Sequence, residues 1–89
     1  MSLSAEVVIR NRRGLHARAS ARLVTLVTGY DAQVWVAKDG EEVTGTSIMG
    51  LMMLAAAPGD SVTVRAEGVQ AEAALKAVVE LIEAKFGEE

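Results

Sequence analysis

The chain has 89 residues, a formal net charge of −3, and a composition that is 51% hydrophobic but only 3% aromatic. This length predicts one domain, residues 1–89, with a core of aliphatic side chains, and the composition argues against disorder. The absence of cysteine excludes disulfide frameworks, thiol nucleophiles and the usual structural zinc sites. The longest apolar run, 48–57, is about half the roughly 20 residues that a membrane crossing needs, so no membrane segment is expected.

Seven stretches have the periodicity of strands or helices. Apolar and polar residues alternate in the strand segments, whereas apolar residues recur at spacings of three and four in the helical ones. The expected elements are a strand at 4–10, a helix from Ala17 that stops at Gly29, strands at 31–38 and 41–44, a short helix at 48–55, a strand at 61–67 and a helix at 71–86. Their order is therefore β-α-β-β-α-β-α.

Local signals determine only part of the topology. Asp39-Gly40 is a strong hairpin turn, so the strands at 31–38 and 41–44 must pair in antiparallel fashion. The residues leave the direction of the other strand pairs open. We expect an α/β (α+β) fold, a two-layer sandwich in which three helices cover one face of a four-stranded sheet.

Positive charge is concentrated near the start of the chain. Five arginines and no acidic residue lie between positions 10 and 22, whereas the rest of the chain is strongly acidic. A nucleic-acid-binding protein would usually be basic over a broad face, so nucleic acid is not an expected partner. One basic patch on an acidic protein indicates instead a site that meets an anion.

The only histidine, His16, lies where the first loop enters the first helix. A helix start presents unpaired N–H groups and the positive end of the helix dipole, so His16 at the N-cap would hold a phosphoryl group above an anion site. The guanidinium of Arg18 can reach the same oxygens, and Gly14 allows the loop to fold over the site. Neutral imidazole is a nucleophile near neutral pH. One histidine without neighbouring Cys, Asp or Glu supplies too few ligands for a metal, so we expect no metal and no cofactor.

The short helix at 48–55 begins after Ser47, which is a typical N-cap residue. The residues expected to face the core are Leu51 and Leu54, with Met53 or Ala55. The apolar residues expected to stay exposed are Ile48, Met49 and Met52. Exposed methionines adapt to several partners, so this helix is a candidate docking surface.

Two motifs carry a family resemblance. The segment Gly14-Leu15-His16-Ala17-Arg18 resembles the active-site motif of HPr, the histidine phosphocarrier of the bacterial phosphotransferase system. The segment Thr46-Ser47-Ile48-Met49-Gly50-Leu51-Met52 resembles the regulatory serine segment of that family. The resemblance covers essentially the whole chain and implies an open-faced sandwich with an antiparallel sheet. One departure is Ala19-Ser20, where many members have proline and alanine; it should alter local rigidity more than chemistry.

The resemblance implies a cycle of phosphoryl transfer. Enzyme I, charged by phosphoenolpyruvate, phosphorylates His16 on Nδ1, and enzyme IIA domains receive the group for sugar uptake or regulation. Arg18 stabilises the phosphoryl group, while Gly14 and Ala17 support the site. Such a carrier is not an independent catalyst, and we expect it to be a cytoplasmic monomer.

The resemblance also assigns regulatory and docking residues. Ser47 is a potential target of HPr kinase/phosphorylase. The residues expected to bind partners are Ser20, Ile48, Met49 and Met52. An alternative function is therefore a regulatory binding module that acts through phosphorylation of Ser47 and the apolar helix surface. A third alternative, a hydrolase or transferase with His16 as general base, lacks an evident substrate pocket and a positioned carboxylate.

Overall fold

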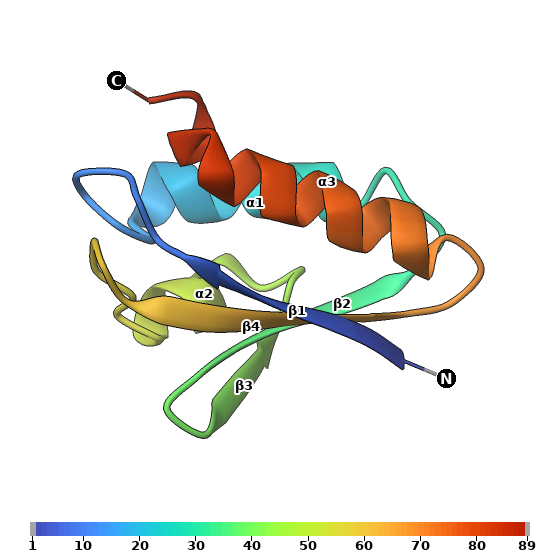
Figure 1. The fold of residues 1–89 in the computed structure, drawn as a ribbon. Coiled ribbons are helices and arrows are strands. Elements are labelled where there is room, and N and C mark those ends of the chain that lie inside the picture. Colours follow the sequence, from blue (N-terminus) through green and yellow to red (C-terminus); the bar gives the residue numbers. More distant parts are fainter. Residues whose placement is uncertain (1, 89) are drawn as a thin grey trace.

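The computed structural model describes residues 2–88 (Figure 1). Within them the elements are β1 (Ser2–Val8), α1 (Ala17–Val27), β2 (Gln33–Lys38), β3 (Glu41–Thr44), α2 (Ile48–Met53), β4 (Ser61–Glu67), α3 (Ala71–Glu83) and a 3-10 turn, η1 (Lys85–Gly87). The predicted order is confirmed, and the bounds of β3 and β4 agree with the prediction. Among the described residues, no helix has the length and apolar character that crossing a bilayer requires.

The four strands form one sheet in the order β1-β4-β2-β3, and every pair is antiparallel. The directions that the residues had left open are therefore those that the family resemblance implied. The register places Val7 opposite Val62 and Val36 opposite Val64. Because side chains alternate along a strand, this register brings the apolar residues of three strands onto one face.

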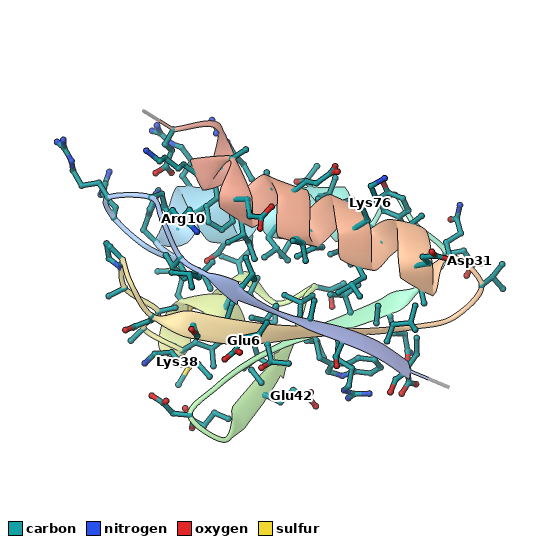
Figure 2. All side chains as sticks on the ribbon, in the orientation of Figure 1. Glu6, Arg10, Asp31, Lys38, Glu42 and Lys76 are labelled. Carbon is teal, nitrogen blue, oxygen red and sulfur yellow. The ribbon has the colours of Figure 1, made fainter. Side chains whose placement is uncertain are left out.

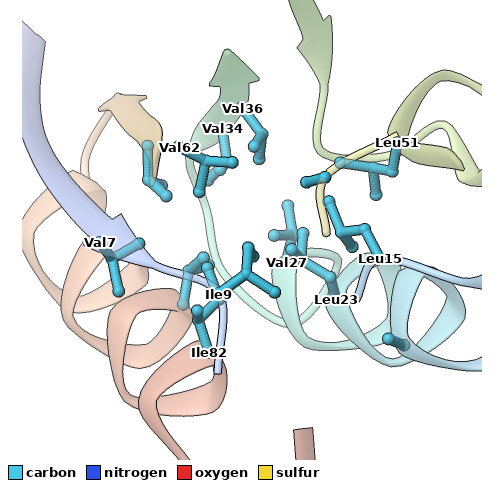
Figure 3. Packing of buried hydrophobic residues seen from close by; sticks show 14 of the residues in the cluster. Val7, Ile9, Leu15, Leu23, Val27, Val34, Val36, Leu51, Val62 and Ile82 are labelled. Carbon is cyan, nitrogen blue, oxygen red and sulfur yellow. The ribbon is translucent and has the colours of Figure 1, made fainter. Parts of the chain in front are cut away.

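Helices α1 and α3 lie side by side over that face, and α2 packs beside α1 (Figure 1). Their apolar stripes enclose a single core with the valines of the sheet, seen from close by in Figure 3. Leu23 of α1, Leu51 of α2 and Val78 of α3 are each fully buried. The predicted two-layer arrangement of three helices and a four-stranded sheet is thus confirmed.

The opposite face of the sheet is open and polar. Figure 2 shows Lys38 and Glu42 on this side, away from Lys76 on α3. Here the guanidinium of Arg65 lies 3.9 Å from the centre of the Trp35 ring and is paired with Glu42 and Glu67 at 2.9 and 2.8 Å. Such a cation–π contact is stabilised because the ring face is electron-rich.

Two expectations about helix ends were wrong. The last α-helix stops at Glu83 rather than at Phe86, yet Phe86 is fully buried because the chain turns back through left-handed backbone at η1. The short helix stops at Met53 rather than at Ala55. One of these two residues was expected to face the core, but both are exposed, Met53 to 75%. The chain then turns through Ala55, with φ of 54°, and Ala56 becomes buried in its place.

Candidate functional site

His16 is the N-cap of α1, as the sequence predicted. Its backbone is extended, and its Nδ1 atom accepts a hydrogen bond from the backbone N–H of Arg18 at 3.2 Å. The first turn of α1 carries no acidic residue, so the helix dipole and the free N–H groups present an uncompensated positive end. This nitrogen of the ring therefore faces the place where an anion is best stabilised.

The other ring nitrogen is paired with a carboxylate that the sequence did not reveal. Oε2 of Glu88 lies 2.6 Å from Nε2 of His16, and the two side chains are only 21% and 16% exposed. Since Nδ1 accepts the Arg18 N–H, its lone pair is free of a proton, and the hydrogen resides on Nε2 and is donated to Glu88. The expectation that His16 lacks a positioned carboxylate was wrong.

Glu88 is itself held in place by Asn11. The Nδ2 group of this fully buried asparagine donates to Oε1 of Glu88 at 3.1 Å and to the backbone carbonyl of Gly14 at 2.7 Å. Desolvation raises the pKa of Glu88, but the hydrogen bonds from Asn11 and His16 and the positive charge of Arg22 outweigh it, so the pKa lies below the ordinary value. Glu88 is consequently ionised at neutral pH.

An open cavity of about 500 Å³ lies over this pair. It is lined by Arg12, Arg13, His16, Arg18 and Glu88. Three of the five clustered arginines therefore surround the histidine in space, and an anion entering the cavity would meet all three. The expectation of no evident pocket was also wrong, although this cavity is open and is lined by His16 and four charged side chains.

Gly14 brings the histidine loop against the segment that follows α2. Its φ is 65°, and a Cβ atom at this position would lie 2.2 Å from the carbonyl oxygen of Ala56. The same oxygen accepts the N–H of Leu15 at 2.9 Å. The conformational freedom that the sequence analysis assigned to Gly14 is thus required, both by its backbone angle and by this close approach.

Ser20 does not belong to an accessible surface. Its side chain is fully buried, and its hydroxyl donates to the backbone carbonyl of Leu15 at 3.2 Å. The prediction that Ser20 contacts partners was wrong, because position 20 points from α1 back into the loop it follows. Ala17, in contrast, is exposed at the first turn of the helix.

Ser47 caps α2 as expected, since its Oγ accepts the N–H of Gly50 at 2.9 Å. The side chains of Ile48, Met49 and Met52 are 40%, 67% and 39% exposed, as the sequence predicted. Met53 adds to them at 75%. We call these four residues the methionine patch. It lies on α2, which packs against α1.

Asn11 and Glu88 were not predicted as site residues from the sequence. An asparagine before Arg12-Arg13-Gly14 has the composition of an ordinary polar loop, and only its complete burial distinguishes it. Glu88 is 72 residues from His16 and stands in an acidic stretch without periodicity. Among the described residues, no group of three or more His, Cys, Asp or Glu could hold a metal ion.

Comparison with known proteins gives a consistent result. Residues 3–84 match the family model described as "PTS HPr component phosphorylation site". The chain is 42% identical over 86 residues to phosphocarrier protein HPr of Neisseria meningitidis, covering 97% of each, and 37% identical over 86 residues to phosphocarrier protein NPr of Shewanella violacea, covering 97% and 94%. A crystal structure of HPr from Thermoanaerobacter tengcongensis superimposes with a TM-score of 0.92 at 45% identity, covering 98% of both chains.

Proposed function

This chain belongs to the HPr family of phosphotransferase-system phosphocarriers, and we propose that it accepts a phosphoryl group on Nδ1 of His16 from enzyme I and transfers it to enzyme IIA domains. The transferred group would serve sugar uptake, regulation or both. One observation supports Nδ1 as the atom that is phosphorylated. The lone pair of Nδ1 faces the start of α1, while Nε2–H is hydrogen-bonded to Glu88.

The geometry supports a direct displacement at phosphorus. The Nδ1 lone pair forms the new N–P bond, while the bond between phosphorus and the donor breaks and its electron pair stays with the donor. The ring becomes an imidazolium in this step because Nε2 keeps its proton, and the carboxylate of Glu88 stabilises that positive charge. The first N–H groups of α1 and the guanidinium of Arg18 stabilise the phosphoryl oxygens. Transfer onward reverses these steps.

The methionine patch supports a docking role for α2. Four exposed apolar side chains lie on this six-residue helix. An exposed apolar patch of this kind marks a site of interaction with another protein. Unbranched methionine side chains repack against differently shaped surfaces, which suits a carrier that must meet a donor and several acceptors in turn. We place the binding of enzyme I and of enzyme IIA on this patch together with the rim of the arginine cavity.

Ser47 favours a second, regulatory function. Its hydroxyl lies at the N-terminus of α2 next to the methionine patch, and HPr kinase/phosphorylase is the proposed modifying enzyme. A phosphate there would remain at a helix start but would place about two negative charges beside an apolar interface. Phosphorylation of Ser47 would then change which partner binds without removing His16.

Labelling with enzyme I and phosphoenolpyruvate tests the primary proposal. The wild-type chain is expected to give an acid-labile, alkali-stable phosphoprotein, and His16→Gln is expected to give none. Ser47→Ala is the matched control and should be labelled normally. Because His16 is the only histidine, a label that survived its replacement would overturn the assignment.

We further propose that the carrier works in the cytoplasm as a monomer without a metal or cofactor. The arginine cavity and the methionine patch are both open in the single chain, so no second copy is needed to complete the site. Light scattering at micromolar concentration is expected to give the mass of one chain, 9.4 kDa, and chelators are expected to leave labelling unchanged.

A further inference from the structure

The segment that carries Glu88 follows an unusual path. Lys85, Phe86 and Gly87 have φ angles of 59°, 55° and 76°, so two residues with side chains occupy the left-handed region in succession. Each costs on the order of 1 kcal/mol relative to ordinary backbone. Phe86 is fully buried, and this burial offsets the strain. This backbone conformation therefore depends on contacts with other parts of the chain.

Arg22 supplies one such contact. Its Nη1 group donates a hydrogen bond to the backbone carbonyl of Phe86, across 64 residues of sequence. A Cβ atom at Gly87 would lie 2.9 Å from the same nitrogen, so the guanidinium is seated directly against the turn. Arg22 lies one turn after Arg18 on α1, and it is not among the residues that line the cavity over His16. It therefore touches the strained segment but not the proposed phosphoryl site.

The contact between Arg22 and the turn affects His16 through Glu88. Glu88 is two residues beyond Phe86, whose carbonyl accepts the Arg22 hydrogen bond. The two carboxylate oxygens of Glu88 are bound by Asn11 and by His16. If the Phe86 carbonyl lost its charged donor, the left-handed turn would relax toward ordinary backbone angles. The carboxylate would then leave Nε2, and the histidine would lose the group that keeps its proton on that nitrogen.

We propose that Arg22 is a positioning residue for phosphoryl transfer: by binding the Phe86 carbonyl it holds Glu88 on His16 Nε2 and keeps Nδ1 as the nucleophile. This inference rests on the proposed function of His16. The charged groups around the pair are Arg12, Arg13 and Arg18, which line the cavity, and Arg22, which lies behind the turn. Only Arg22 among these arginines has a hydrogen bond to the C-terminal segment in the described structure.

Arg22→Met tests the inference, because it keeps the aliphatic stem and suits an exposed helix position. Lys76→Met is the control: it removes one positive charge from the exposed surface of α3, away from the turn (Figure 2). The ¹⁵N signals of the His16 ring report which nitrogen carries the proton, and a single histidine gives one pair of signals. We expect Arg22→Met and Glu88→Gln each to bring the two signals closer together, and Lys76→Met to leave them unchanged.

Phosphoryl transfer from enzyme I gives the second measurement. Arg22→Met is expected to slow it about tenfold, the scale of one charge-assisted hydrogen bond, and to have no further effect when Glu88→Gln is already present. Unchanged ring signals would overturn the inference. So would an equal slowing by Arg22→Met with and without Glu88, because Arg22 would then act on the phosphoryl group or the partner directly. Failure of the wild type to be labelled would overturn the function of His16 instead, while the ring signals would still report on Arg22.

Discussion

Gly14 and Ala56 lie so close together that a Cβ atom at position 14 would be 2.2 Å from the Ala56 carbonyl oxygen. This approach joins the histidine loop to the end of α2, so the proposed phosphoryl site and the methionine patch share one rigid support. Gly14→Ala should therefore destabilise the fold by about 2–4 kcal/mol, through a left-handed alanine and a steric clash.

Gly40→Ala is the matched control for this change. Gly40 also has a positive φ, of 85°, but a Cβ atom there would meet nothing within 4 Å. Its cost should be about 1 kcal/mol, from backbone strain alone. Denaturant unfolding of both variants gives the comparison, and equal losses would show that the contact with Ala56 contributes nothing.

The ionised carboxylate of Glu88 makes stability depend on pH. Its pKa is lower in the folded chain than the ordinary value of 4.5, so its contribution is present above that value and is lost as the pH falls through the folded pKa. Wild type should be more stable than Glu88→Gln at pH 6, and the difference should shrink below about pH 4.5 and vanish under strongly acidic conditions. Chemical unfolding across this range measures it. Glu80→Gln is the matched control, because it removes a carboxylate from the exposed surface of α3, away from His16.

Arg18→Glu should slow phosphorylation by enzyme I by at least about tenfold, because it removes a charged donor and adds repulsion toward the phosphoryl oxygens. Arg10→Glu makes the same change of charge at an exposed residue outside the cavity lining. It should slow the reaction much less. Initial labelling rates at fixed enzyme I distinguish the two, and similar rates for both variants would mean that Arg18 contributes only general attraction.

Ser20→Ala should act on stability and not on docking. Its buried hydroxyl donates to the Leu15 carbonyl, and leaving that carbonyl unpaired costs about 1–2 kcal/mol. The melting temperature should fall accordingly, while the affinity of the folded protein for enzyme IIA stays that of the wild type. A selective loss of affinity at unchanged stability would restore Ser20 to the partner surface.

Substitutions at Met53 and Leu51 should affect different properties, partner binding for Met53 and stability for Leu51. Met53 is 75% exposed, so Met53→Ser should change the free energy of unfolding by less than about 0.5 kcal/mol and weaken partner binding. Leu51 is fully buried, and Leu51→Ala should cost about 2–5 kcal/mol. Unfolding and titration calorimetry separate the two effects. Partner affinity unaffected by Met53→Ser would remove this residue from the docking surface.

Local signals explain what the sequence predicted well. The Asp39-Gly40 turn, the Ser47 cap and the alternation in β4 each depend on residues within a few positions of one another. His16 at the start of α1 belongs to the same class, because a helix start is encoded by its own residues. The family resemblance added the strand directions, which the residues alone had left undecided.

The errors came from contacts distant in sequence. Because Phe86 is apolar and fits the helical spacing, the last helix was predicted to extend to it. Phe86 is indeed buried, but it lies in a left-handed turn that no spacing rule describes. The window from 10 to 22 contains no acid in the sequence, yet Glu88 enters it in space. Either Met53 or Ala55 was expected in the core of a helix that runs to Ala55; α2 stops earlier, both residues are exposed, and Ala56 is buried instead.

The Trp35–Arg65 contact provides an intrinsic fluorescence probe of the sheet. Trp35 is the only tryptophan, so intrinsic fluorescence excited at its absorption band originates from one indole. Its neighbours Val34 and Val36 point into the core, so the ring lies on the opposite, open face of the sheet, under the Arg65 guanidinium. Emission therefore follows the separation of β2 from β4 on unfolding, while the helix-covered side carries His16. Sheet integrity can therefore be followed in the unmodified chain, without an added fluorophore.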